Sequence, residues 1–190
     1  PQIARGLLAR LRAAERPVLY AGNGIRWSGG MELFRRLCSA LDIPVVTCWD
    51  SVDLIATDDA HYCGRGGNMG DRAGNFAVQN SDFLLCIGAR MSIYQVGWNT
   101  ATWARAAYVA MVDIDPLELS KPILRVDLPI CADAAEFMAA LIAAAEGEQF
   151  SHGAWREQCA AWKAAYPIVQ ERHRAPQSPA NVYAFVDCLS

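Results

Sequence analysis

Residues 81–90 read Ser-Asp-Phe-Leu-Leu-Cys-Ile-Gly-Ala-Arg, an apolar run that begins after polar residues and stops at a glycine. A run without polar alternation is typical of a strand buried on both faces of a parallel sheet. Four further segments resemble it, at 17–22, 43–48, 107–113 and 124–131. Helical patterns alternate with these strands, at 2–14, 28–41, 73–80 and 134–145. The alternation predicts an α/β fold, a Rossmann-like parallel sheet of five strands with helices on both faces.

The composition is that of a folded protein. Of the 190 residues, 53% are hydrophobic and 19% are charged, which is enough apolar surface to offset the entropy of ordering the backbone. The formal net charge of -3 offers no electrostatic basis for binding nucleic acid or an anionic membrane. The longest apolar stretch, 137–145, is far shorter than the roughly 20 residues of a membrane-spanning helix. We therefore expect a soluble protein with neither a nucleic acid nor a membrane partner.

Seven cysteines are too widely spaced to form the Cys-x-x-Cys pairs of zinc or thiol-redox sites. Their odd number and lack of pairing indicate a reducing compartment, so we expect a cytoplasmic location. Neither a GxSxG nor a GxxxxGK[ST] motif occurs, and His61, His152 and His173 have no neighbouring nucleophile. The sequence predicts no catalytic residue and no metal ligand in this segment, and it predicts solvated positions for the histidines.

The two ends of the chain indicate a segment of a longer protein. The sequence opens on Pro1 and stops within a helical pattern at 181–187. Before that end, a polar stretch at 170–179 predicts a linker. The helix that precedes the linker, which Ser151 can cap, carries one apolar stripe formed by Trp155, Cys159, Trp162 and Tyr166. We interpret the stripe as a packing surface and the helix as a C-terminal connector helix.

Candidate binding residues follow the predicted strands, because ligands of open α/β sheets bind outside the carboxyl ends of the strands. Glycines allow a phosphate to approach the backbone, an arginine offers a fork for phosphate, and an aspartate accepts from ribose hydroxyls. Such residues would together suit an adenine nucleotide. They occur at 22–24, 47–48, 88–90, 113–115 and 132–133.

Each of these segments also has a purely structural interpretation. The segment 22–24 supplies two glycines of GxGxxG, but Trp27 stands where the third glycine belongs, so a tight strand-to-helix turn is the alternative. Arg90 can be an ordinary surface arginine. The aspartates of 113–115 can simply cap the turn that follows them.

Five segments occur in a characteristic order and spacing. They are 16–24 (Arg-Pro-Val-Leu-Tyr-Ala-Gly-Asn-Gly), 43–47, 81–90, 112–121 (Val-Asp-Ile-Asp-Pro-Leu-Glu-Leu-Ser-Lys) and 131–133. Together they resemble the central domain of thiamine diphosphate enzymes of the acetolactate synthase type. The resemblance spans about residues 3–141.

The resemblance implies a division of labour within a longer parent enzyme. Residues 1–146 would form a central nucleotide-binding-like domain, and 147–190 a connector helix and the start of the following cofactor-binding domain, which is absent. The parent would be a lyase or transferase that decarboxylates a 2-keto acid and joins the product to an acceptor. Its thiamine diphosphate and magnesium would be held by flanking pyrimidine-binding and diphosphate-binding domains, in a homodimer or homotetramer. By itself this segment would be catalytically inert.

The resemblance also implies a nucleotide in this domain, since some members of the family carry FAD or ADP here. Two departures bear on FAD: segment 67–70 lacks the histidine of the family's GMHG, and 91–94 lacks the acidic residues that follow GAR. An empty groove is the alternative. The residues that match the family's nucleotide-binding positions are Gly22, Gly24, Thr47, Gly88, Ala89, Arg90, Asp113, Ile114 and Asp133.

Two other classes of protein use similar sheets. One is a free-standing NAD-dependent oxidoreductase or a sirtuin-like deacylase. The missing third glycine argues against the oxidoreductase, and the absence of paired cysteines for a structural zinc argues against the deacylase. The other is a regulatory or interaction module, which would bind no nucleotide.

Overall fold

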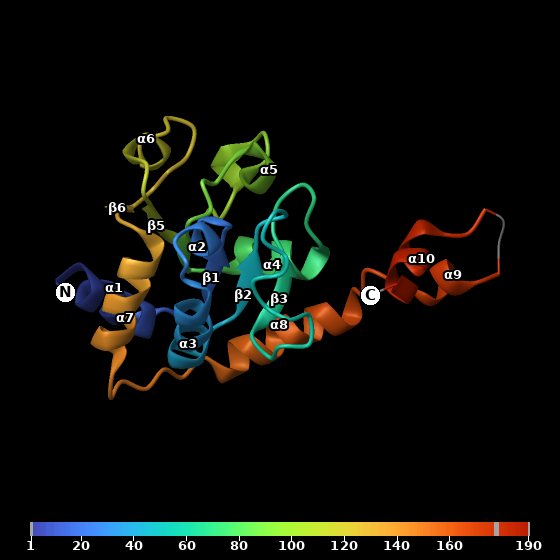
Figure 1. Ribbon diagram of the computed structural model, residues 1–190, viewed down its shortest axis with the longest axis horizontal. Coiled ribbons are helices and arrows are strands. Elements are labelled where there is room, and N and C mark those ends of the chain that lie inside the picture. Colours follow the sequence, from blue (N-terminus) through green and yellow to red (C-terminus); the bar gives the residue numbers. More distant parts are fainter. Residues whose placement is uncertain (1, 177–178, 190) are drawn as a thin grey trace.

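The computed structural model describes residues 2–176 and 179–189, and within them a six-stranded parallel sheet lies at the centre of the molecule (Figure 1). The strand order is β3-β2-β1-β4-β5-β6. This architecture confirms the predicted α/β, Rossmann-like fold. The strands are β1 (Pro17–Ala21), β2 (Val45–Thr47), β3 (Tyr62–Arg65), β4 (Phe83–Ile87), β5 (Tyr108–Asp113) and β6 (Leu128–Cys131).

The sheet has one strand more than the predicted five. β3 lies inside a stretch, 49–72, whose glycines and polar residues predict a loop. It pairs with β2 through its backbone, and the register shifts between Val45 and Val46. An edge strand of this kind is held by main-chain hydrogen bonds to its neighbour and carries no apolar run for sequence patterning to detect. β6 is also shorter than the predicted 124–131.

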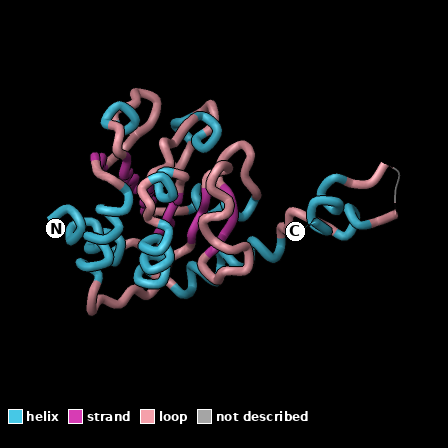
Figure 2. The backbone as a smooth tube through the Cα atoms, in the orientation of Figure 1, coloured by secondary structure: helices cyan, strands magenta, loops and turns pink. Residues whose placement is uncertain are grey.

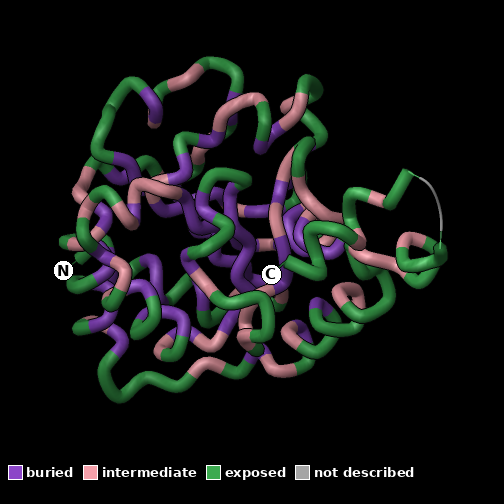
Figure 3. Tube along the Cα trace, turned by 45° about the vertical axis from the view of Figure 1, so that its right-hand side comes forward, coloured by how far each residue is buried: buried purple, intermediate pink, exposed green. Residues whose placement is uncertain are grey.

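Helices cover both faces of the sheet (Figures 1 and 2). One core contains the inward sides of α1 (Gln2–Ala13), α3 (Met31–Leu41) and α7 (Ala134–Ala145). The other contains residues of α4 (Arg72–Asn80) and α8 (Gly153–Ala165). Buried segments gather at the sheet and on the helix sides turned toward it, whereas the outer loops are exposed (Figure 3). The remaining elements are short: α2 (Gly24–Trp27), α5 (Ile93–Val96), the 3-10 turn η1 (Thr100–Thr102), α6 (Pro116–Leu119), α9 (Glu171–Arg174) and α10 (Val182–Leu189).

The helix α8 packs tightly against the sheet domain. The indole nitrogen of Trp155 donates to the carbonyl oxygen of Pro17 at 3.0 Å. The Trp155 ring also meets that of Trp162 edge to face at 5.5 Å between centroids. The next residue of the helix, Arg156, pairs with Asp42 at the end of α3, Nη1 to Oδ1 at 2.8 Å. The predicted apolar stripe is therefore a packing surface, with Trp155 and Cys159 buried.

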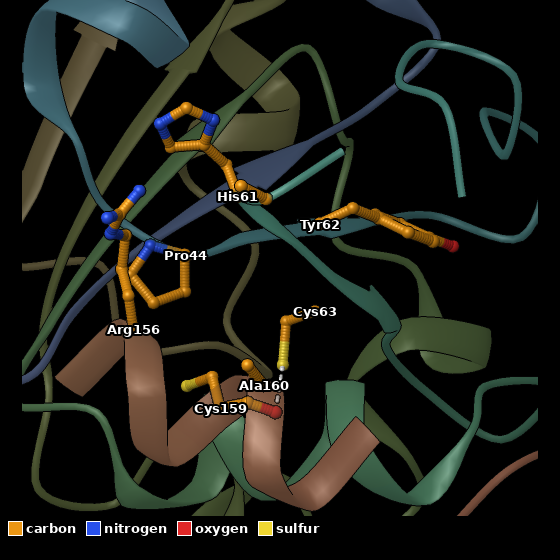
Figure 4. Close-up of a pocket in the computed structure, with 8 residues that line it drawn as sticks. Pro44, His61, Tyr62, Cys63, Arg156, Cys159 and Ala160 are labelled. Carbon is orange, nitrogen blue, oxygen red and sulfur yellow. Dashed lines mark hydrogen bonds between the residues drawn. The ribbon is translucent and has the colours of Figure 1, made fainter. Parts of the chain in front are cut away.

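A cavity of about 10 Å³ marks the junction of α8 with β3 (Figure 4). That volume matches a single water molecule. The Cys63 thiol of β3 points toward α8 and donates to the carbonyl oxygen of Cys159 at 4.0 Å. Burial raises the pKa of the buried thiols Cys38 and Cys48 to about 12, so both stay protonated at neutral pH. All seven cysteines are free.

The C-terminal segment departs from its prediction in two places. His152, not Ser151, occupies the N-cap of α8. The predicted linker 170–179 contains the short helix α9, and its positions 177–178 lie outside the described residues. Beyond α8, α9 and α10 extend away from the sheet (Figure 1). No helix among the described residues is long and apolar enough to cross a membrane.

Replacing Trp155 tests how far α8 belongs to the folded domain. Trp155→Ala is expected to lower the free energy of unfolding by about 3–5 kcal/mol, because it empties a buried site and leaves the Pro17 carbonyl without its donor. Trp98→Ala is the matched control, since Trp98 is 86% exposed and its loss should change stability by less than about 0.5 kcal/mol. Urea denaturation followed by circular dichroism measures both. Equal effects of the two changes would mean that the packing of α8 contributes little to the stability of the domain.

Candidate nucleotide groove

A groove of about 600 Å³ opens at the carboxyl edge of the sheet, over the ends of β1, β4, β5 and β6. All strands are parallel, but β2 and β3 are added on one side of the central β1–β4 pair and β5 and β6 on the other, and open α/β sheets bind ligands at such a switch point in the strand order. The structure brings seven of the nine predicted residues together in the lining. They are Gly24, Gly88, Ala89, Arg90, Asp113, Ile114 and Asp133.

The floor of the groove is a contact between two backbone turns. A Cβ on Gly22 would lie 2.2 Å from the carbonyl oxygen of Gly88, and a Cβ on Gly24 would lie 2.7 Å from the Cα of Gly88. Gly88 has φ +58, in the left-handed region that favours glycine. The Gly24 amide donates to the Gly88 carbonyl at 3.0 Å. The tight-turn interpretation of these glycines is thus correct, and it leaves bare backbone along the groove.

Two predicted residues lie outside the lining. Gly22 sits beneath it, pressed against the turn after β4. Thr47 is fully buried at the end of β2, and its carbonyl accepts from the Gly66 amide at 3.0 Å. Thr47 therefore faces the β3 side of the sheet edge, where it holds the loop after that strand.

Among the described residues that line the groove, Asp113 carries the one buried carboxylate oxygen without a hydrogen-bond donor. The residue is 6% exposed. Its Oδ1 accepts from the Asp115 amide at 3.0 Å, whereas Oδ2 has no donor in the described part of the chain. A buried acceptor without a partner is costly, so it calls for a donor from a ligand or a water molecule. Ribose hydroxyls are donors of this kind.

Two further aspartates at this edge, Asp115 and Asp133, are helix caps. Asp115 accepts from the Leu117 amide at 2.9 Å and begins α6. Asp133 accepts from the Ala135 amide at 2.8 Å and begins α7. The capping interpretation is therefore correct for Asp115, while Asp133 caps a helix and lines the groove at the same time.

Arg90 lies on the rim in an unusual backbone conformation, with φ +53. Its Nε and Nη2 donate to the same Oε1 of Glu118, at 3.0 and 2.7 Å. Lys121 pairs with that carboxylate and donates to the Arg90 carbonyl at 2.9 Å. Burial alone would raise the pKa of Glu118, but hydrogen bonds from Lys121 and Arg90 lower it below its ordinary value. Arg90 is exposed but not free.

Sequence patterns missed the aromatic side of the groove. Trp49 lines it from the loop after β2 and Tyr94 from α5, with ring centroids 6.3 Å apart. Trp27, which replaces the third glycine of the motif, also lines it and is 84% exposed. The signal available in the sequence was position alone, since loops that follow parallel strands meet at one edge.

The prediction of solvated histidines is wrong for two of the three. His61 is largely buried and its ring contacts Asp59 and Asp42 at 2.9 and 3.2 Å. His152 is buried, with Nε2 3.1 Å from the carbonyl oxygen of Ala14. In both cases the ring contacts a residue far away in the chain, Asp42 for His61 and Ala14 for His152, and the local sequence does not reveal such contacts. None of the three histidines lines the groove.

A family model described as "Thiamine pyrophosphate enzyme, central domain" matches residues 4–141, well over half of the chain. This chain belongs to that family. Membership decides against a free-standing NAD-dependent oxidoreductase or sirtuin-like deacylase.

Curated relatives of this central domain are longer enzymes. It is 35% identical to an acetolactate synthase large subunit from Lactococcus lactis, over 67% of this chain and 22% of the relative. It is 37% identical to a probable acetolactate synthase large subunit from Methanocaldococcus jannaschii, over 69% and 22%. A pyruvate oxidase from Lactiplantibacillus plantarum is 28% identical over the whole chain and 31% of its own length. The chain thus spans about a fifth to a third of these relatives.

The backbone floor of this central domain is testable with two glycine variants. Gly22→Ala is expected to lower the free energy of unfolding by about 1–3 kcal/mol or more, because its Cβ meets main-chain atoms that have no rotamer to adopt. Gly6→Ala is the control: Gly6 lies within α1 with nothing near its Cβ position, so the change should stabilise by about 0.5–1 kcal/mol. Thermal and urea denaturation measure both. A neutral Gly22→Ala would show that the two turns can separate freely.

Proposed function

We propose that this chain is the central part of an acetolactate synthase-like enzyme that decarboxylates a 2-keto acid and joins the product to an acceptor. The match to the family of central domains carries the proposal, and the names of the relatives support it. Thiamine diphosphate would supply the electron sink for decarboxylation, with magnesium, from domains beyond this segment. Within this proposal, residues 1–146 space the flanking domains, 147–190 connect to the next one, and the segment alone is inert. We further propose a cytoplasmic homodimer or homotetramer.

We propose that the groove holds an adenine nucleotide, either ADP or the ADP part of FAD. Its volume of about 600 Å³ suits such a ligand. The glycine floor offers backbone at close range to a diphosphate, and Arg90 offers a positive charge at the rim. Asp113 Oδ2 offers the acceptor that a ribose hydroxyl needs. FAD, when bound, would supply a flavin, and the exposed rings of Trp27 and Trp49 offer it stacking surface.

Calorimetric titration tests the groove. The wild-type chain is expected to bind ADP and FAD more tightly than NAD. Asp113→Asn should weaken binding by about tenfold, because an amide nitrogen or a neutral oxygen replaces a charged acceptor. Asp58→Asn is the control, since Asp58 is exposed and outside the groove. Micromolar binding of NAD without a response to ADP or FAD would contradict the nucleotide proposal.

Activity of the full-length parent tests the wider proposal. The parent is expected to release carbon dioxide from a 2-keto acid such as pyruvate only when thiamine diphosphate and magnesium are both present, since the decarboxylation needs that electron sink. The 190-residue chain should release none under the same conditions. Release that is independent of thiamine diphosphate would overturn the assignment of the reaction.

A further inference from the structure

Glu118 makes an ion pair whose burial is uneven. The Glu118 side chain is 9% exposed, whereas that of Arg90 is 73% exposed. The carboxylate lies on α6, the turn of helix that follows β5, and reaches across to Arg90 in the turn that follows β4. A carboxylate withdrawn from water needs its partners to offset the cost of desolvation. Lys121 supplies a second one and binds the Arg90 carbonyl as well.

The geometry restrains both the main chain and the side chain of Arg90. Lys121 holds the carbonyl of a residue in the left-handed region, and Met91 follows it with φ +44. Glu118 takes the edge of the guanidinium formed by Nε and Nη2. A planar guanidinium fixed along one edge has one orientation, with its other edge and its faces left for a ligand. An exposed arginine without such a clamp would sample many rotamers.

We propose that Glu118 is a positioning residue of the nucleotide groove, which fixes the guanidinium of Arg90 for contact with the phosphates or the base. The inference rests on the nucleotide proposed for this groove. Glu118 itself is absent from the groove lining and acts through Arg90. With the Glu118 contact in place, the side-chain entropy of Arg90 is lost when the protein folds, so less entropy is lost when the ligand binds.

A competing effect has the opposite sign. Glu118 carries a negative charge near the site, and its removal would strengthen the attraction of Arg90 for an anionic ligand. Salt separates the two effects, because a charge effect at an exposed site is screened at high ionic strength and an orienting contact is screened less. The positioning role therefore predicts weaker binding by the neutral variant at low and at high salt.

A double-mutant cycle tests the inference on the purified 190-residue chain with ADP as the probe. Glu118→Gln is expected to raise the Kd by about tenfold, and by no more than about twofold when Arg90 is already alanine, since contacting residues are not additive. Arg90→Lys keeps the charge but loses the fork, so it should weaken binding as much as Glu118→Gln while leaving the buried carboxylate in place. Thermal denaturation of each variant checks that it is folded.

Glu148→Gln is the matched control. Glu148 also pairs with an arginine, Arg12, but it lies beyond the far end of α7, about 18 Å along that helix from the groove. It should leave the Kd unchanged. Tighter binding by Glu118→Gln at low salt, or an equal loss in the presence and absence of Arg90, would overturn the positioning role while leaving the nucleotide site intact. A wild-type chain that binds neither ADP nor FAD would overturn both proposals.

Discussion

The backbone contact between the turns after β1 and β4 is the constraint on which the groove depends. Gly22 and Gly24 come so close to Gly88 that no side chain fits at any of the three positions. β1 and β4 pair directly at the centre of the sheet, so the contact sits where the strand order reverses direction. Its consequence is a floor of bare main chain, flanked by side chains from the strands on one side and from the long loops on the other.

A single turn after β5 organises much of what surrounds that floor. Asp113 ends the strand with an unsatisfied buried oxygen, and Asp115 caps α6 two residues later. The short helix then places Glu118 against Arg90 in the turn after β4, and Lys121, just beyond the helix, binds the Arg90 carbonyl. The nine-residue segment 113–121 therefore has two roles. It supplies the free acceptor oxygen of Asp113, and through Glu118 and Lys121 it holds Arg90 in place.

Hydrophobic sequence patterns predicted the strands that are buried on both faces and missed the elements and contacts that carry no apolar run. The strands β1, β2, β4 and β5 are buried on both faces, so their apolar runs were unambiguous. The sequence did not predict β3, because Gly64 and Arg65 are residues typical of loops. This edge strand is defined only by its pairing with β2. Local patterns also placed His152 at a helix start but could not show that Ala14 and Phe150 lie beside its ring. The aromatic side of the groove was also not predicted, because Trp49 and Tyr94 are 45 positions apart in the chain and meet only in the folded structure.

The sequence by itself determined the class of fold, the edge of the sheet that carries the groove, and the family, because these depend on periodicity and on short motifs that follow strands. It also determined which residues are glycine, aspartate or arginine at that edge. Only the tertiary structure decided which of these residues line the groove and which contacts each of them makes. It placed Gly22 beneath the groove and Thr47 outside it, left one buried oxygen of Asp113 without a partner, and joined Arg90 to Glu118. Those outcomes depend on distances between segments that are far apart in the chain, and a linear pattern carries no information about such distances.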